Sequence, residues 1–296
     1  MENRKGLSKF VLQNIPISKP TLMYSVLNKD MIKNEIVPHI PLAKRGFQVT
    51  VPLEEIVNAI LYKLKTGIQW HQLPVKALFE GTILSWEAVY YHYRKWCTNY
   101  VFKQCWITIL KKNKSKLDLS IVDFDGSHTP TIRGGEAVEY QARKKRKTTN
   151  ALYLSDRQGL PLAISNPVAG NHNDLYDIEV QFEVVMATLE EADIAVEGLF
   201  LNADAGFDSK EFRLSCEKKE INANICFNKR NGNVDRDEYF DQELYNQRYT
   251  IERTNAWMDS SRSLLNRFDT TVLSWIGFNY LAFITIALKK FTKIKV

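Results

Sequence analysis

The sequence predicts a mixed α/β fold: a small all-α domain of the helix-turn-helix type, followed by a mixed sheet flanked by helices. Three observations support this prediction. Several segments before residue 111 space their apolar residues as helices do, the lysine-rich stretch Lys111–Lys116 follows them, and short apolar runs then alternate with amphipathic segments. The predicted domains are residues 1–116, which include an N-terminal leader and a basic linker, and residues 117–296.

The first domain is predicted from its helical spacing and its helix-ending residues. The leader, residues 1–20, is polar and holds two prolines. A helix over residues 52–65 has Pro52 in its first turn and Gly67 after its end. A second begins after Ser85, a good N-cap residue, and runs to Cys97, and a third covers residues 101–110. Most aromatic side chains of the second helix are predicted to be core. Four residues of this helix are better placed to face a partner: Tyr91, His92, Arg94 and Lys95.

The second domain is predicted from short strands that alternate with helices. Strands are expected at residues 117–125, 149–155, 161–165, 199–204 and 221–227, with a hairpin turn at Asp156–Gly159. Helices are expected at residues 174–191, 209–219, 245–265 and 273–291, and a polar loop at residues 228–238. Three strands followed by alternating helices and strands predict a mixed sheet with helices on its faces.

Composition limits the class of protein. Hydrophobic residues make up 45% of the 296, so a sizeable core is available and wholesale disorder is excluded. The net charge of +6 is unevenly divided, because residues 1–116 hold 18 Lys and Arg against 7 Asp and Glu, whereas the rest hold 22 against 27. A net charge of +11 in the first domain suits contact with a polyanion, although a basic surface without a partner is the alternative.

Two further features bear on the compartment. The four cysteines form no C-x-x-C pair and lie near no histidine at metal-ligand spacing, which predicts reduced thiols in a cytosolic protein and no zinc site. The polar N-terminus lacks the apolar core of a signal peptide. The apolar run 272–288 is interrupted by polar residues and is short for a bilayer, so a buried helix is predicted, with a membrane span as the alternative.

Three acidic residues from separate segments predict a metal site. Asp125 and Asp204 close predicted strands, where ligands of such sheets bind, and each is followed within two residues by a glycine that permits close approach. Glu252 lies in a predicted helix. Carboxylates suit Mg²⁺, and two ions shared by the three acids would relieve their mutual repulsion. The alternative for a lone aspartate is a turn or helix cap, and Asp123, on the same strand face, is a rival to Asp125.

These motifs resemble those of a known family. Asp125-Gly-Ser, Asn202-Ala-Asp-Ala-Gly-Phe-Asp208 and Glu252-Arg-Thr-Asn-Ala-Trp257 resemble the acidic motifs of bacterial insertion-sequence transposases, in the groups named after insertion sequences four and five. Gly67-Ile-Gln-Trp-His-Gln-Leu-Pro74 and Gly170-Asn-His-Asn-Asp174 are similar to that family as well. The resemblance runs from about Pro38 to the C-terminus and covers its motifs in order.

The resemblance implies an RNase H-like catalytic domain with a DDE triad, formed here by Asp125, Asp204 and Glu252. It implies Mg²⁺, two ions that Mn²⁺ can replace, hydrolysis at the ends of the element, and attack of the freed 3′ hydroxyl on target DNA. The partners implied are double-stranded DNA, as terminal inverted repeats and target, and a second copy of the chain. A bacterial protein of the cytoplasm, associated with the nucleoid, is expected.

The residues expected to contact DNA follow from the same motifs. Many relatives carry Tyr-x₂-Arg-x₃-Glu-x₆-Lys, which Tyr245, Arg248 and Glu252 match, but Asp259 stands where the lysine is expected. Arg253 or Arg262 is a candidate replacement for this lysine. The five-cation run is expected to grip the DNA backbone, with a solvated loop as the alternative: Arg143, Lys144, Lys145, Arg146 and Lys147. The alternative functions are a nuclease of the same fold that does not join strands and an inactive DNA-binding repressor.

Overall fold

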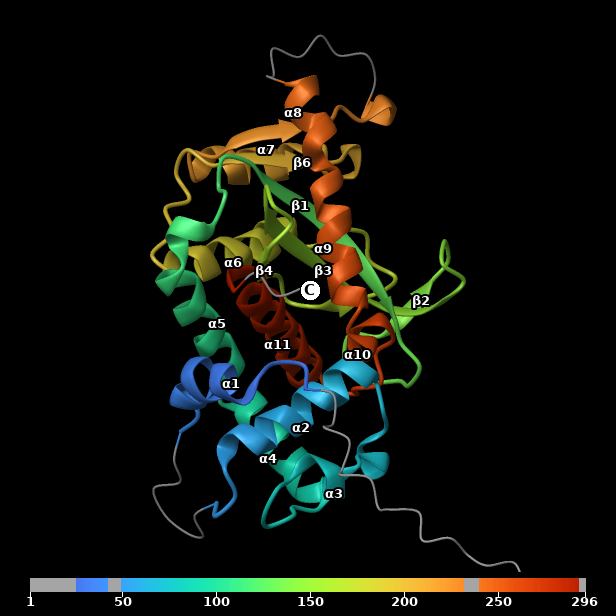
Figure 1. Ribbon diagram of the computed structural model, residues 1–296. Coiled ribbons are helices and arrows are strands. Elements are labelled where there is room, and N and C mark those ends of the chain that lie inside the picture. The colour runs from blue at the N-terminus through green and yellow to red at the C-terminus, as the bar shows by residue number, and fades with distance from the viewer. Residues whose placement is uncertain (1–24, 42–48, 232–239, 293–296) are drawn as a thin grey trace, which may run out of the picture.

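The computed structural model describes residues 25–41, 49–231 and 240–292. The predicted leader at residues 1–20 and most of the predicted polar loop at residues 228–238 lie outside these ranges. Figure 1 shows an elongated arrangement with the front helices at one end, the sheet in the middle and α7 and α8 towards the other end.

The front part is helical, as predicted. It contains α1 (Lys29–Glu35), α2 (Leu53–Thr66), α3 (Val75–Leu78), α4 (Trp86–Thr98) and α5 (Val101–Lys112), with short 3-10 turns η1 (Val37–His39), η2 (Trp70–Gln72) and η3 (Lys114–Lys116). Gly67 ends α2 with φ of 69°, and the Ser85 hydroxyl accepts a hydrogen bond from the Ala88 amide at the start of α4. The predicted linker is wrong in detail, because residues 111–116 continue α5 and then form η3.

The sheet is mixed, with strand order β2-β3-β1-β6-β7, and β4 and β5 also pair with β3. The bounds are β1 (Val122–Pro130), β2 (Glu139–Gln141), β3 (Arg146–Asp156), β4 (Pro161–Ile164), β5 (Val168–Ala169), β6 (Phe200–Ala203) and β7 (Asn222–Ile225). Strand β1 is antiparallel to β3 and parallel to β6. The short strands β2 and β5 were not predicted.

The position of Asp125 on β1 differs from the prediction. The strand does not end at Asp125 but continues to Pro130, because the long strand β3 pairs with every residue from Val122 to Pro130. The parallel partner β6 pairs only as far as Phe124. Asp125 is therefore in mid-strand, yet it is the first residue of β1 beyond the parallel pairing, where the sheet opens.

The rear helices are α6 (Ile178–Glu191), α7 (Lys210–Lys218), α8 (Gln242–Asn246), α9 (Thr250–Asp259), α10 (Arg262–Leu265) and α11 (Val272–Phe291), with 3-10 turns η4 (Ala205–Phe207), η5 (Lys229–Asn231) and η6 (Gln247–Tyr249). Helix α6 begins later than predicted, after Asp177 in the left-handed region. Ser209 caps α7, whereas Asp208 instead binds the Arg213 side chain. The helix predicted over 245–265 is divided, and α9 and α10 meet at Ser260–Ser261.

Helix α11 joins the front helices to the sheet (Figure 1). The ring of Tyr93 on α4 stacks on Phe278 with centroids 4.4 Å apart, and Trp106 on α5 meets Phe283 at 5.5 Å. On the sheet side, the Tyr153 hydroxyl donates to Asn279 Oδ1 at 2.9 Å. One apolar cluster thus spans both predicted domains. By length and composition α11 could cross a membrane, but 78% of its most apolar window is buried inside the protein, as predicted for a core helix.

Candidate active site

Asp125 and Asp204 are brought side by side by the parallel pairing of β1 with β6. Phe124 is the register partner of Ala203, so the residues that follow them, Asp125 and Asp204, leave the pairing at the same level. The Asp204 carboxylate accepts a hydrogen bond from the Gly206 amide at 2.7 Å, and Asp125 Oδ1 accepts one from the Gly126 amide at 2.9 Å. Both predicted acids therefore lie at one opening of the sheet.

The surroundings of Asp125 disfavour its charged form. Burial raises the pKa of Asp125 to about 7, and the neighbouring Asp204 and Asp174 carboxylates act in the same direction. Arg248 opposes them, with Nη1 3.8 Å from Asp125 Oδ2. The guanidinium of Arg248 also lies 5.6 Å from the ring centre of Tyr245, so the predicted Tyr-x₂-Arg pair is in place beside the acids.

Asp123, the rival to Asp125, has a different position. It is only 1% exposed and accepts hydrogen bonds from Asn202 Nδ2, at 3.2 Å, and from the Thr250 hydroxyl. Because Thr250 begins α9, Asp123 ties this helix to the sheet. Its carboxylate has its partners inside the protein and is not available at the opening.

Two asparagines continue this polar contact across the sheet, and nothing but their place in predicted strands indicated them beforehand. Asn224 Nδ2 donates to Asn202 Oδ1 at 2.8 Å and to the Asp241 carbonyl at 3.0 Å. Asn202 Nδ2 donates to the Leu244 carbonyl at 3.0 Å. Buried amides with several partners fix the backbone they hold. They position α8 and η6, which carry Tyr245 and Arg248, over the ends of the strands.

Glu252 is not brought to the two aspartates. On α9, Thr250 and Thr254 are buried towards the sheet and its turn, and the Thr254 hydroxyl donates to the Gly159 carbonyl at 2.7 Å. Glu252 lies on the exposed side, one helical turn beyond Arg248. Within residues 25–41, 49–231 and 240–292, no three His, Cys, Asp or Glu side chains are grouped to hold a metal ion.

Asp174 is a member of this site that sequence reasoning did not count. Its carboxylate accepts a hydrogen bond from Asn150 Nδ2 at 2.7 Å and lies over Gly126, where a Cβ would be 2.2 Å from Asp174 Oδ1. The glycine that was expected to admit a ligand thus admits this side chain. The Gly170–Asp174 motif was the available signal, but its loop position gave no distance to Asp125.

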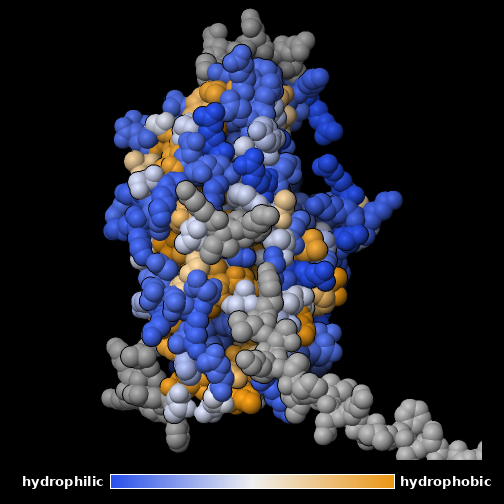
Figure 2. Space-filling view, in the orientation of Figure 1, coloured by the Kyte–Doolittle hydropathy of each residue, from blue (hydrophilic) through white to orange (hydrophobic). Residues whose placement is uncertain are grey.

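The predicted basic run forms the exposed end of the β2–β3 hairpin. Lys145, with φ of 52°, makes the turn, and all five cations are exposed. Figure 1 shows this hairpin projecting beside α9 and α10, and Figure 2 shows its projecting end as hydrophilic. Lys144 donates to the His128 carbonyl at 3.2 Å. Lys144 also opposes the rise that burial causes in the pKa of Asp259, so a hairpin cation acts near the position of the missing lysine.

The other predicted cations are placed as follows. Arg94 and Lys95 are exposed on α4. Arg253 Nη1 donates to the Gln158 carbonyl at 3.2 Å, and the Arg262 backbone and Cβ lie against Gly67. These contacts place Arg253 at the turn between β3 and β4 and Arg262 at the end of α2. Neither position supports the residue as the replacement for the lysine.

Comparison with known proteins identifies the family. A model described as a transposase of the IS4/5 family matches residues 34–106, and a model described as a transposase DDE domain matches residues 114–272, more than half of the chain. No curated protein matches the chain. Among solved structures, a piggyBac transposase synaptic complex with hairpin DNA is 11% identical with a TM-score of 0.46, over 90% of this chain and 76% of that one.

A Mos1 transposase paired-end complex is 12% identical with a TM-score of 0.27, over 85% of this chain and 83% of that one. These likenesses are remote, and the assignment rests on the family models. The mixed sheet with its flanking helices, preceded by a helical region, confirms the predicted α/β fold class. The chain therefore belongs to the DDE transposase family, in the IS4/5 group, and is a DNA transposase.

Proposed function

We propose that Asp125, Asp204 and Glu252 are the catalytic metal ligands of this transposase. The observation that carries the proposal is the pairing of β1 with β6, which sets the Asp125 and Asp204 carboxylates at one opening of the sheet. Divalent metals serve the chemistry of DDE transposases. We propose two Mg²⁺ ions, replaceable by Mn²⁺, because hard cations of this kind take carboxylate oxygens together with water and phosphate oxygens.

The residues present fit a cation at this position. A carboxylate whose pKa is raised to about 7 by burial and by two other acids gains from any positive charge that comes close. In the structure Arg248 supplies that charge from 3.8 Å. When bound, the metal activates water or a DNA hydroxyl and stabilises the leaving 3′ oxygen of the phosphodiester.

Glu252 joins the site, in this proposal, when Arg248 leaves Asp125. Arg248 on η6 and Glu252 at the start of α9 are four residues apart, so a carboxylate follows the cation by about one helical turn. Once released, the Arg248 guanidinium is free to hold a DNA phosphate with Tyr245 beside it.

The DNA is proposed to lie along the exposed cations. The β2–β3 hairpin, with Arg143–Lys147, offers phosphate contacts that give affinity without sequence choice. The front helices, with Arg94 and Lys95 exposed on α4, are proposed to read the terminal inverted repeats. Two ends must be held together for transposition, so we propose a homodimer on DNA, acting on the chromosome in the cytoplasm.

The test is the substitution Asp204→Asn. It keeps the side-chain size and the acceptor for the Gly206 amide but removes a charge. We expect unchanged DNA binding and loss of Mg²⁺-dependent cleavage of a duplex that carries the inverted repeat flanking the gene. The exposed acid Glu243 on α8 gives the matched control Glu243→Gln, which should cleave normally. Cleavage by Asp204→Asn at the wild-type rate would remove Asp204 from the site. A pre-cut end incubated with target DNA separately tests strand transfer.

A further inference from the structure

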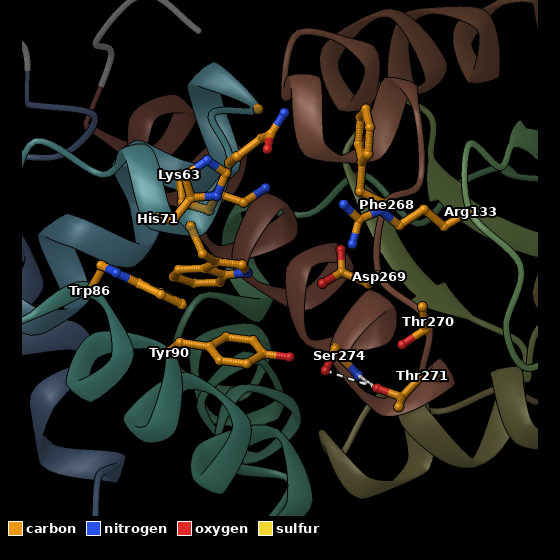
Figure 3. Close-up of a pocket in the computed structure, with 13 residues that line it drawn as sticks. Lys63, His71, Trp86, Tyr90, Arg133, Phe268, Asp269, Thr270, Thr271 and Ser274 are labelled. Atoms are coloured by element: carbon orange, nitrogen blue, oxygen red, sulfur yellow. Dashed lines mark hydrogen bonds between the residues drawn. The ribbon is translucent and has the colours of Figure 1, made fainter.

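A cavity of about 310 Å³ lies between the front helices and the segment that leads into α11 (Figure 3), and neither Asp125 nor Asp204 lines it. This volume is within the range of small-ligand pockets, roughly 300–1,000 Å³. Its walls include part of the Gly67–Pro74 motif, to which neither the fold nor the metal site assigns a role. The lining residues that matter here are Trp70, His71, Trp86, Tyr90, Arg133 and Asp269.

One wall of the cavity is aromatic. Trp86 and Tyr90 are one turn apart on α4 and lie together on one side in Figure 3. The Trp70 ring, on η2, lies 5.0 Å from Tyr90, and His71 meets Trp86 edge-on at 6.5 Å. The same face of α4 continues to Arg94, whose guanidinium lies 5.9 Å from the Tyr90 ring. An exposed cation predicted to contact DNA therefore adjoins the aromatic wall.

The opposite wall is polar and charged. Figure 3 shows Asp269, Arg133 and Thr271 facing Trp86 and Tyr90 across the cavity. Burial raises the pKa of Asp269, and the positive charges of Lys63 and Arg267 oppose this rise. The Asp269 carboxylate accepts a hydrogen bond from its own backbone amide, and within the described part of the chain it has none from another side chain, so it can accept further donors. Arg133 is exposed at the mouth.

These walls specify the ligand chemistry. Flat aromatic faces favour a planar ring, an open carboxylate favours ring N–H or amino donors, and Arg133 at the mouth favours a phosphate. Two cations of the lining, Lys63 and Arg133, disfavour a simple ammonium ligand. A nucleotide unites a planar ring with N–H donors and a phosphate.

We propose that this cavity holds one unpaired nucleotide of the transposase's DNA, with its base against Trp86 and Tyr90 and its phosphate at Arg133. The proposal rests on the proposed function in that DNA is the substrate. Strand β1 and its continuation link the two sites, since Arg133 follows Asp125 by eight residues. At about 3.3 Å per residue, the cavity is at most about 26 Å from Asp125. This distance is about eight steps of duplex DNA at 3.4 Å per step.

The experiment compares two duplexes of equal length, one fully paired and one with a single unpaired adenine, in buffer without divalent metal so that nothing is cut. The wild-type protein should bind the second more tightly, by roughly fivefold or more, the lower end of base stacking on an aromatic side chain. A 2-aminopurine at the unpaired position should lose fluorescence on binding. Trp86→Ala should abolish both effects, and Trp86→Phe, which keeps an aromatic face, should retain them.

Two control substitutions, Tyr91→Ala and Lys95→Ala, lie on α4, the helix that carries Trp86. Tyr91→Ala removes an aromatic ring that is 61% exposed and outside the cavity, and it should keep the preference. Arg133→Ala should reduce the preference, whereas Lys95→Ala should weaken binding to both duplexes equally. Equal binding of the two duplexes by the wild type, or a preference that survives in Trp86→Ala, would overturn the proposal. So would adenosine monophosphate binding as tightly as the unpaired duplex, since the cavity would then serve a free nucleotide. If the wild-type protein cuts DNA in the Asp204 test but does not prefer the duplex with the unpaired adenine, this inference fails and the proposed function stands.

Discussion

The substitution Gly126→Ala tests whether Asp174 belongs to the acidic site. The backbone of Gly126 is outside the left-handed region, so alanine can adopt it. The added Cβ would lie 2.2 Å from Asp174 Oδ1 and 2.5 Å from its Cγ, so the carboxylate must move. Its movement breaks the 2.7 Å hydrogen bond from Asn150. Asn150 is fully buried and its Oδ1 already has no partner among the described residues, so the amide is left unsatisfied.

The expected cost follows from that bond. A hydrogen bond to a charged group contributes about 1.5–3 kcal/mol, and replacing glycine by alanine returns about 0.4–1 kcal/mol through the unfolded chain. The net loss in the free energy of unfolding is therefore roughly 0.5–2.5 kcal/mol, or a fall in Tm of roughly 1–10 °C. Denaturant and thermal unfolding without divalent metal measure it. Gly134→Ala, with nothing within 4 Å of the added Cβ, is the control and should change little.

A double-mutant cycle gives the refutation. Asp174→Ala removes the carboxylate that Gly126→Ala displaces, so the second substitution should cost nothing in that background. The two single effects would then fail to add by about 1 kcal/mol or more. Additivity within about 0.5 kcal/mol would mean that Asp174 does not lie over Gly126, and that its place beside Asp125 is wrong.

Three other predictions concern charge. The folded pKa of Asp125 is above its ordinary value of 3.8, so the metal-free protein should lose stability as pH rises from about 4 to 7. Asp125→Asn should flatten this slope and raise the free energy of unfolding at pH 8 by up to about 4 kcal/mol. Arg248→Gln removes the cation that opposes this rise, so the pH-dependent loss of stability of the metal-free protein should extend to higher pH, and an unmoved stability profile would contradict the contact. Replacing Arg143, Lys144 and Lys145 by alanine should reduce the slope of log K against log salt by roughly 3 if each contacts a phosphate, and an unchanged slope would place DNA elsewhere.

The predicted fold succeeded where local pattern and tertiary structure agree. Helix α2 has one buried stripe between Pro52 and Gly67, and its predicted bounds differ from the observed ones by one residue. Strand β1 shows the limit. Its length is set by pairing with β3, in which the partners run from Val122 with Asp156 to Pro130 with Thr148, and no local pattern carries that information. Strands β2 and β5 are two or three residues long and exist only because β3 offers an edge to them.

The predicted site shows the same division. The position of Asp125 and Asp204 at one opening of the sheet could be predicted because a carboxylate after an apolar run has a local signature, and the parallel register then places them together. Asp174 comes from a loop, and only its hydrogen bond to Asn150 on β3 fixes it over Gly126. The buried ties from Asp123 and Asn202 could not be predicted either, since a polar residue inside a short strand gives no indication of its partner.

The arrangement of Arg248 and Glu252 suits a site whose three acids come together only when metal and DNA bind. Helix α9 is anchored through Thr250 to Asp123, so its rotation relative to β1 is fixed. With that rotation fixed, Arg248 on η6 lies against Asp125, whereas Glu252, four residues later on α9, lies on the exposed side. The cation already neutralises part of the charge of three acids, and a fourth carboxylate brought close would raise their repulsion further. We therefore propose that Glu252 approaches when positive charge replaces Arg248, and that metal and DNA phosphate together make this exchange favourable: the metal for the acids and the phosphate for the arginine.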